Sequence, residues 1–417
     1  MIYKLPAILI LSCLSSFRVA NSQDTPAAAN PVEAAAIQFS LTAEEFESLI
    51  DQKADLLFTT GKKEEDVTIT GFATIKSGDR FSLVKYKTED SPREKRLASM
   101  KLFQLTVGEK TYTANYLPSV RASALQDVEQ LREDIESRLN GQREQLWSPT
   151  SKEDMEKYVL EEKEFLKKVG EHFPNRGMQF YETEYFLFFT DFPPNQVAPY
   201  LANLDKMNEV LGQSFGFAPG QNIWRGKAVV VAFVDQVAFQ EFERELMNNP
   251  ETGEAQGLCH SFGSGRVVVG CYRGGDPSYF AALLVHETSH GYCHRYLSTV
   301  HIPSWINEGL AEWVASKAVP REREMNRRRQ EATTRLRQTG TLEGVLSNRV
   351  SGHWQYGAAH SMVDLLIREN PQQFRLFFNG IKHGLPWEDS LVRAYGATPA
   401  DLVRLYGRAI GVPNLGP

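Results

Sequence analysis

The residues whose types and spacing best suit chemistry lie between positions 286 and 312. His286 and His290 are four positions apart, and Glu287 directly follows the first, which gives the pattern H-E-x-x-H. Side chains four apart lie on one face of a helix, so both imidazoles can reach one metal ion. Glu287 would then lie beside that ion, where it could act as a general base. The pattern predicts a zinc site on a helix.

The third ligand must come from elsewhere. His294 continues the spacing of four, but eight helical residues span about 12 Å, so His286 and His294 cannot both bind one zinc ion at about 2 Å. The H-E-x-x-H-x-x-G-x-x-H arrangement is excluded, because Cys293 and Tyr296 occupy its glycine and histidine positions. Glu308 remains the best ligand. Two histidines and one carboxylate leave the fourth zinc position open, as catalysis requires.

Glu312 lies one helical turn beyond Glu308, on the same face. Histidine ligands of zinc donate their second ring N–H to an acceptor, commonly a carboxylate. We therefore expect Glu312 to accept from a ligand, with His286 as the first choice; a surface salt bridge is the alternative. These residues predict hydrolysis through a zinc-activated water with Glu287 as general base, and an oxyanion donor is still needed.

The surrounding pattern predicts the elements that position these residues. Asp276 and Pro277 form a helix start, since aspartate accepts from free N–H groups and proline fits the first turn. Strands followed by helices indicate an α+β catalytic domain over 175–417. The expected strands are 184–191, 227–234, 257–260 and 266–272, and the expected helices are 195–211, 236–247, 304–318, 321–338, 354–370, 371–381, 387–395 and 399–409.

Four segments precede this domain. Residues 1–22 have the composition of a secretory signal peptide, with a lipoprotein cleavage site at Cys13 as the lesser alternative. Residues 23–38 form a Pro/Ala-rich linker that we expect to be disordered. Residues 39–118 indicate a small β-rich domain, and residues 119–174 a charged helical connector. The expected strands are 67–73, 81–86, 101–107 and 111–116.

Two charged regions have helical periodicity. Apolar residues from Leu125 to Leu139 recur every three or four positions, so we expect helix over 121–171 with a solvated face. The basic cluster at 321–329 is interleaved with glutamates and also favours a solvated helix face over an anion site.

Composition is that of an ordinary globular protein: 42% of the 417 residues are hydrophobic, and the net charge of −6 gives no footprint for nucleic acid. Beyond the signal segment, no stretch is apolar enough to cross a membrane. Cys259 and Cys271 flank a glycine-rich hairpin and form either a disulfide or two core residues. We expect Cys293 to pack within the metal-binding helix.

The motifs H-E-T-S-H and N-E-G-L-A-E together resemble the gluzincin superfamily of zinc peptidases, which includes thermolysin and the aminopeptidase N type. They are most similar to its peptidase MA-like domains. The resemblance implies that His286, His290 and Glu308 bind Zn²⁺ and that Glu287 is the general base. It also implies that Glu312 supports the first histidine, although aspartate is more familiar there.

The resemblance also supplies an oxyanion donor. Tyr356 begins a segment similar to the Y-x-x-G of the aminopeptidases, whose tyrosine stabilises the oxyanion, although Ala359 replaces the glycine. The alternative is a tyrosine packed at a helix start. The G-x-M-E-N motif that anchors a free amino terminus is absent, which favours an endopeptidase or a substrate that is not a simple peptide. Residues 265–270 take its place, either as an edge strand for an extended peptide or as an ordinary inner strand.

The sequence therefore predicts an exported zinc metallopeptidase, secreted or in the cell envelope, that acts on peptides or proteins. Its catalytic domain is expected to have a gluzincin fold, with a mixed β-sheet lobe and a helical C-terminal lobe. The alternatives are another zinc hydrolase on the same scaffold and a non-catalytic binding protein with a vestigial zinc site. Glu287 argues against the last, because a structural zinc site needs no general base.

Overall fold

A computed structural model describes residues 40–417 except 77, 118–119, 141–145, 348–349 and 351. The predicted signal peptide, Cys13 and the predicted linker up to residue 38 lie outside the described residues. The described chain forms two compact units, one of residues 146–375 and one of residues 40–140 with 376–417. It contains both helices and sheets, which confirms a mixed α+β class. No helix in the described part is long and apolar enough to cross a membrane.

The second of these units is built on a seven-stranded sheet in the order β2-β1-β5-β6-β7-β3-β4. β2 also pairs with β3, so six of the strands close into a barrel and β4 extends it. The four strands expected here from the sequence are present. The strands are β1 Lys53–Phe58, β2 Lys63–Thr74, β3 Phe81–Thr88, β4 Ser91–Ala98, β5 Leu102–Val107, β6 Lys110–Leu117 and β7 Ala122–Asp127, and the short helix α2 Ala43–Ser48 precedes them.

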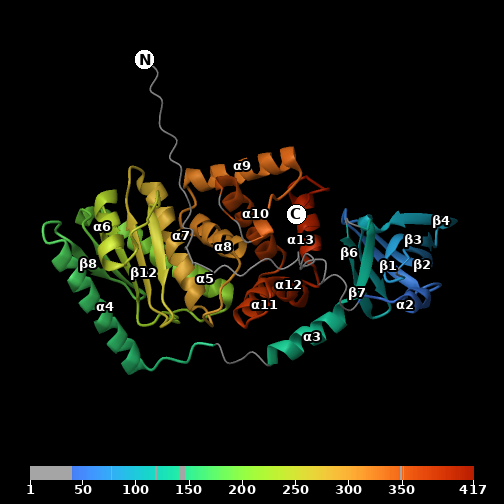
Figure 1. Ribbon diagram of the computed structural model, residues 1–417, viewed down its shortest axis with the longest axis horizontal. Coiled ribbons are helices and arrows are strands. Elements are labelled where there is room, and N and C mark those ends of the chain that lie inside the picture. The colour runs from blue at the N-terminus through green and yellow to red at the C-terminus, as the bar shows by residue number, and fades with distance from the viewer. Residues whose placement is uncertain (1–39, 77, 118–119, 141–145, 348–349, 351) are drawn as a thin grey trace, which may run out of the picture. The chain divides into compact units, whose positions relative to one another are not determined.

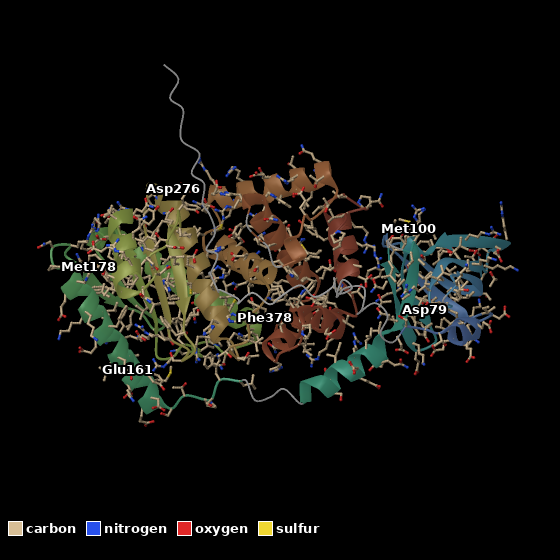
Figure 2. All side chains as sticks on the ribbon, viewed as in Figure 1. Asp79, Met100, Glu161, Met178, Asp276 and Phe378 are labelled. Atoms are coloured by element: carbon tan, nitrogen blue, oxygen red, sulfur yellow. The ribbon has the colours of Figure 1, made fainter. Side chains whose placement is uncertain are left out.

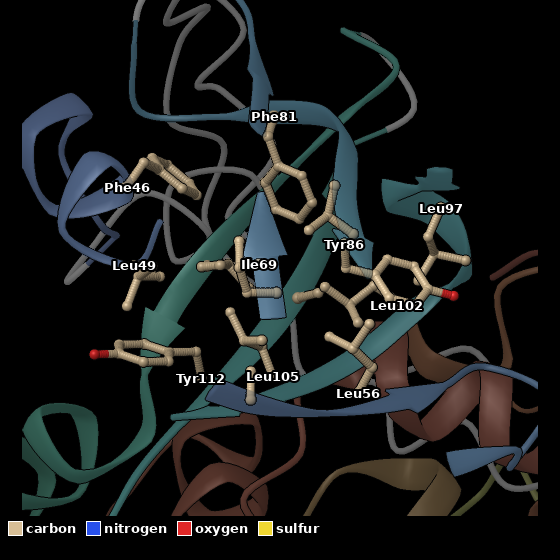
Figure 3. Packing of buried hydrophobic residues seen from close by; sticks show 14 of the residues in the cluster. Phe46, Leu49, Leu56, Ile69, Phe81, Tyr86, Leu97, Leu102, Leu105 and Tyr112 are labelled. Carbon is tan, nitrogen blue, oxygen red and sulfur yellow. The ribbon is translucent and has the colours of Figure 1, made fainter. Parts of the chain in front are cut away.

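Alternating apolar residues of these strands fill the barrel interior. Leu56, Ile69, Phe81 and Leu105 are fully buried, and Figure 3 shows them converging with their neighbours from several strands. This alternation is the period-2 pattern of half-buried strands, which explains why most of the barrel could be predicted.

The prediction of helix from residue 121 is wrong at its start. Ala122–Asp127 is strand β7, which pairs with β6 along its length and is buried at every position. The helix α3 begins only at Val128 and ends at Asn140. Leu125 fits a helical stripe by coincidence, because the strand that completes the barrel runs directly into the helix.

The C-terminal helices also differ from the expected domain boundary. Residues from 376 onward group with the barrel and not with the metal-bearing unit, so the division falls within α11. Asp401 is fully buried and accepts hydrogen bonds from Thr113 of β6 at 2.9 Å and from Thr398 N at 2.7 Å. The helices are α11 Pro371–Lys382, α12 Trp387–Tyr395 and α13 Pro399–Ala409.

The other unit contains a five-stranded mixed sheet in the order β11-β12-β10-β9-β8. β9, β10 and β12 are parallel, and β8 and β11 run antiparallel at the two edges. The strands are β8 Gln179–Glu182, β9 Phe186–Thr190, β10 Ala228–Phe233, β11 Gly257–Ser261 and β12 Val267–Tyr272. The helices are α4 Lys152–His172, α5 Ala198–Phe215, α6 Gln236–Leu246, α7 Pro277–Arg295, α8 Ser304–Ala318, α9 Arg323–Thr339 and α10 His353–Glu369.

Helices cover both faces of this sheet. α4 and α6 pack on one face through a single apolar cluster, and α7 lies on the other (Figure 1). The metal-motif helix α7 then packs against α8, and α10 packs against both α8 and α9. α4 belongs to this core through Leu166 and Val169, so it is more than the solvated connector expected from its charge.

Candidate active site

α7 and α8 position the metal motif. Asp276, labelled in Figure 2, caps α7 by accepting from Ser278 N at 2.8 Å and Tyr279 N at 3.1 Å, as the sequence predicts. Pro303 precedes α8, which spans the 304–318 expected from its pattern. Both helices are largely buried, so the motif side chains are held by packing as well as by backbone hydrogen bonds.

Three potential metal ligands converge between these helices. His286, His290 and Glu308 each offer a ligand atom within 4.8 Å of the others. Glu308 Oε2 lies 3.2 Å from His286 Nε2 and 3.6 Å from His290 Nε2. Ligand atoms that surround one tetrahedral zinc ion at 2.0–2.2 Å lie about 3.3–3.6 Å apart. The distances from Glu308 to the two histidines are therefore those expected of ligands to one zinc ion.

Glu287 lies beside this set, partly buried in the wall of a cavity. Burial raises the pKa of its carboxyl to about 7, with Glu308 and Glu243 adding to the increase and His286 opposing it. For Glu308, burial also acts to raise the pKa, but His290 and His286 outweigh it and the net pKa is lowered. The pKa values of these two neighbouring carboxyls are thus shifted in opposite directions, which is typical of paired carboxyls that have different roles.

Glu312 does not make the predicted hydrogen bond to His286. Its Oε1 lies 3.7 Å from His286 Nδ1, which is too long for a hydrogen bond, and instead accepts from Arg328 Nη1 at 2.6 Å. Glu312 is 1% exposed, so the surface salt bridge that was the alternative is in fact a buried one. His286 Nδ1 and Glu312 Oε2 are both buried without a hydrogen-bond partner in the described structure.

A cavity of about 370 Å³ opens onto the metal set. Tyr356 lies on its wall, with its ring centroid 6.2 Å from that of His286. This places the predicted oxyanion donor in the cavity rather than in the protein core. The other lining residues come from β11 and its approach, α7, the loop at 300–302 and the helices α8 to α10.

Other residues considered from the sequence fall outside the metal set. His294 is absent from the metal-ligand group, and its Nε2 lies 3.0 Å from the Phe262 carbonyl oxygen. Cys259 and Cys271 are free thiols, which resolves the open question of a disulfide between them. Cys293 is buried in α7 and lines the cavity.

Of the two interpretations of residues 265–270, the ordinary inner strand is the one that the structure confirms. Val267–Tyr272 is the inner strand β12, so the edge-strand interpretation of residues 265–270 is wrong. β11 is the edge strand, and a Cβ at its Gly257 would lie 3.0 Å from Glu287 Cγ. Strand order depends on contacts remote in the chain, so the local pattern could not decide between the two strands.

Arg328 is the residue that sequence reasoning missed. Its cluster was expected to be a solvated helix face, yet Arg328 is 7% exposed and lines the cavity. Besides Glu312, it donates to the Tyr279 hydroxyl at 3.3 Å and lies 5.7 Å from the Tyr356 ring centroid. The one available signal is position: Arg328 lies three residues after Met325, which is buried on the same helix.

Replacing Arg328 with methionine is expected to destabilise the protein by about 3–5 kcal/mol, because Glu312 would keep a buried charge without its partner. Chemical denaturation measures the effect. Arg327→Met is the matched control: it lies next on the same helix, is 58% exposed and should cost less than about 1 kcal/mol. Equal effects of the two substitutions would contradict a buried ion pair.

His360 is a core histidine. It is 3% exposed, and its Nε2 lies 3.4 Å from Ser316 Oγ. Burial, with Arg329 next, lowers its pKa to about 3, and Asp364 opposes this. In the unfolded chain this histidine takes up a proton near pH 6.5, whereas in the folded chain it stays neutral until about pH 3. The free energy of unfolding therefore falls as the pH decreases from about 6.5 toward 3.

Between pH 7 and pH 5 this single group should remove about 2 kcal/mol of stability. The His360→Asn variant should be less stable than the wild type at pH 7. Its free energy of unfolding should, however, fall less between pH 7 and pH 5 than that of the wild type. Denaturation midpoints at both pH values measure the difference in slope. Identical pH slopes would show that His360 does not stay neutral in the folded state.

No family model, curated protein or solved structure matches this chain. The candidate site combines two imidazoles and a carboxylate suited to zinc, a partly buried carboxyl with a raised pKa, and a tyrosine, around one cavity beside an edge strand. Such a set can activate water against a carbonyl group and supply a proton acceptor and a hydrogen-bond donor.

Proposed function

We propose that this protein is a zinc-dependent peptidase of the gluzincin type, acting as an endopeptidase on extended segments of peptides or proteins. The observation that supports this best is the convergence of His286, His290 and Glu308 at the spacing of tetrahedral zinc ligands, with Glu287 beside them. The predicted signal peptide would place this activity outside the cytoplasm.

When bound, zinc would lower the pKa of a coordinated water and polarise the scissile carbonyl. His286 and His290 of α7 and Glu308 of α8 would hold it. Glu287 accepts the proton of the attacking water and returns it to the leaving amine, a role suited to a carboxyl whose pKa is raised to about 7. Tyr356 donates a hydrogen bond to the developing oxyanion from the cavity wall.

A peptide substrate is favoured by the edge strand. β11 lies at the end of the sheet and lines the cavity from Gly257 to Ser261 except at His260. An extended peptide can add to such an edge through main-chain hydrogen bonds, which would bring its carbonyl groups past Glu287. Such pairing does not require the amino or carboxyl terminus of the substrate, so it is compatible with cleavage within a chain.

Endopeptidase action is supported by the charges in the cavity. Among the described lining residues, the only carboxylates are Glu287 and Glu308, and both already have roles. The only arginine there, Arg328, is paired with Glu312. An exopeptidase needs an additional charge to hold a substrate terminus, and the described cavity offers no carboxylate for a terminal amine.

The test is cleavage of a peptide library by the zinc-loaded protein, followed by mass spectrometry. We expect cuts within peptides, their loss after chelation and their return with zinc. Zinc bound at about one ion per chain with no cleavage would overturn the peptidase proposal and favour the binding-protein alternative. Cleavage of esters or other amides alone would favour another zinc hydrolase on the same scaffold.

A further inference from the structure

The β11–β12 hairpin is held from the face of the sheet opposite the cavity by two buried carboxylates. The first is Glu243 on α6, which is fully buried. His260 of β11 places its Nε2 2.8 Å from Glu243 Oε2 and 3.1 Å from Oε1. Asn249 Nδ2 also donates to Oε2 at 3.0 Å.

The neighbouring strand makes room for this carboxylate. A Cβ at Gly270 of β12 would lie 2.4 Å from Glu243 Oε1 and 2.9 Å from the Phe242 ring. Any side chain at position 270 would therefore displace Glu243 from beneath the hairpin. A glycine in the middle of a buried strand weakens the strand, so its presence here is explained by this close approach.

The second carboxylate is Glu162 on α4, which is 1% exposed. Arg266, in the turn of the hairpin, donates from Nε to both of its oxygens at 2.8 and 2.9 Å. The guanidinium also lies over the rings of Phe165 and Phe262, at 4.3 and 5.4 Å from their centroids. One carboxylate thus holds the edge strand and the other holds the turn that follows it.

The alternation of β11 connects this far face to the site. Gly257 and Cys259 lie on the side of β11 that faces α7, where Gly257 is next to Glu287 and Cys259 is next to Gly291. The His260 side chain points the other way, toward α6. A shift of the strand at His260 therefore moves the residues that face Glu287. Buried charged groups contribute little net stability compared with apolar residues, so stability alone does not account for two buried carboxylates behind one hairpin.

We propose that Glu243 and Glu162 are positioning residues that fix the edge strand, and with it an extended substrate, relative to the zinc ligands and Glu287. This inference rests on the proposed peptidase function. It predicts that loss of these carboxylate contacts slows the cleavage of long peptides, which pair with the edge strand, more than the cleavage of short substrates, which reach only the zinc site.

The test compares Glu243→Leu, Glu243→Gln and Glu162→Gln with Glu241→Gln as the matched control. Glu241 is on the same helix as Glu243, but it is 41% exposed and pairs with His172 on the surface. For a library-derived long peptide, we expect kcat/KM to fall about 10–100-fold in Glu243→Leu, less in Glu243→Gln, and not at all in the control. Zinc content should stay near wild type, and cleavage of a short substrate should fall much less than cleavage of the long peptide.

Amide hydrogen exchange over residues 257–272 provides a readout that does not depend on catalysis. We expect faster exchange in Glu243→Leu and in His260→Ala, a variant that removes the contact from the strand side should the first fail to fold. Unchanged exchange and unchanged long-peptide cleavage in folded, zinc-loaded variants would overturn the positioning role. If these variants exchange faster but the wild-type protein cleaves no peptide, the two carboxylates do fix the edge strand, and it is the peptidase proposal that fails.

Discussion

Replacing Glu287 with glutamine is expected to lower kcat/KM for peptide cleavage by about 10²–10⁴-fold. Glutamine keeps the size of the side chain but cannot accept the proton of the attacking water. Because Glu287 is not in the ligand set, zinc content should stay at about one ion per chain. Steady-state kinetics with metal analysis on the same samples measures both quantities.

Glu254→Gln is the control for this substitution, since Glu254 is an exposed glutamate at the approach to β11 and lies outside the cavity lining. It should cleave at the wild-type rate. A Glu287→Gln protein that binds zinc and cleaves within threefold of wild type would contradict the assignment of Glu287 as general base. Loss of zinc from that variant would instead indicate that Glu287 takes part in binding the metal.

Replacing Glu308 with alanine should have the second large effect. It removes one of three protein ligands, and we expect zinc affinity to fall at least about a hundredfold, since loss of a partner outside the ligand set alone costs about 10–100-fold. The stabilisation of wild type by zinc, about 4 kcal/mol at a thousandfold excess over Kd, should fall to about 1.4 kcal/mol or less at the same zinc concentration. Zinc titration followed by thermal unfolding measures both changes.

Asn307→Ala provides the comparison for Glu308→Ala, because Asn307 precedes Glu308 on α8 and also lines the cavity. It should retain zinc affinity and the zinc-dependent shift in Tm. If Glu308→Ala bound zinc as tightly as Asn307→Ala, the third ligand would have to be another group.

The metal motif could be predicted from sequence because its geometry is local. Positions 286 and 290 share a helix face whatever the rest of the chain does. The rise of a helix is by itself enough to exclude His294 as a ligand of the same zinc ion as His286. Glu308 required one further assumption, that a second helix packs beside the first. α8 does so, and the three side chains meet.

What could not be predicted depends on contacts remote in sequence. Arg328 lies in the same basic run as its exposed neighbour Arg327, and apart from its spacing of three from Met325 only the packing of α9 near Tyr279 and Glu312 shows that it is buried. The role of β11 as the edge strand depends on sheet order, and β7 was missed because a strand and a helix follow each other without a turn. Burial and strand order are set by the fold as a whole.

Titration of chelator-treated protein with zinc, with the rate of peptide cleavage recorded at each step, tests the central claim most directly. The account predicts no cleavage without metal and a rate that rises to a plateau at one zinc ion per chain, with Glu287→Gln binding the same amount but staying inactive. Cleavage that is undiminished in the metal-free protein, or failure of the wild type to take up zinc, would contradict it.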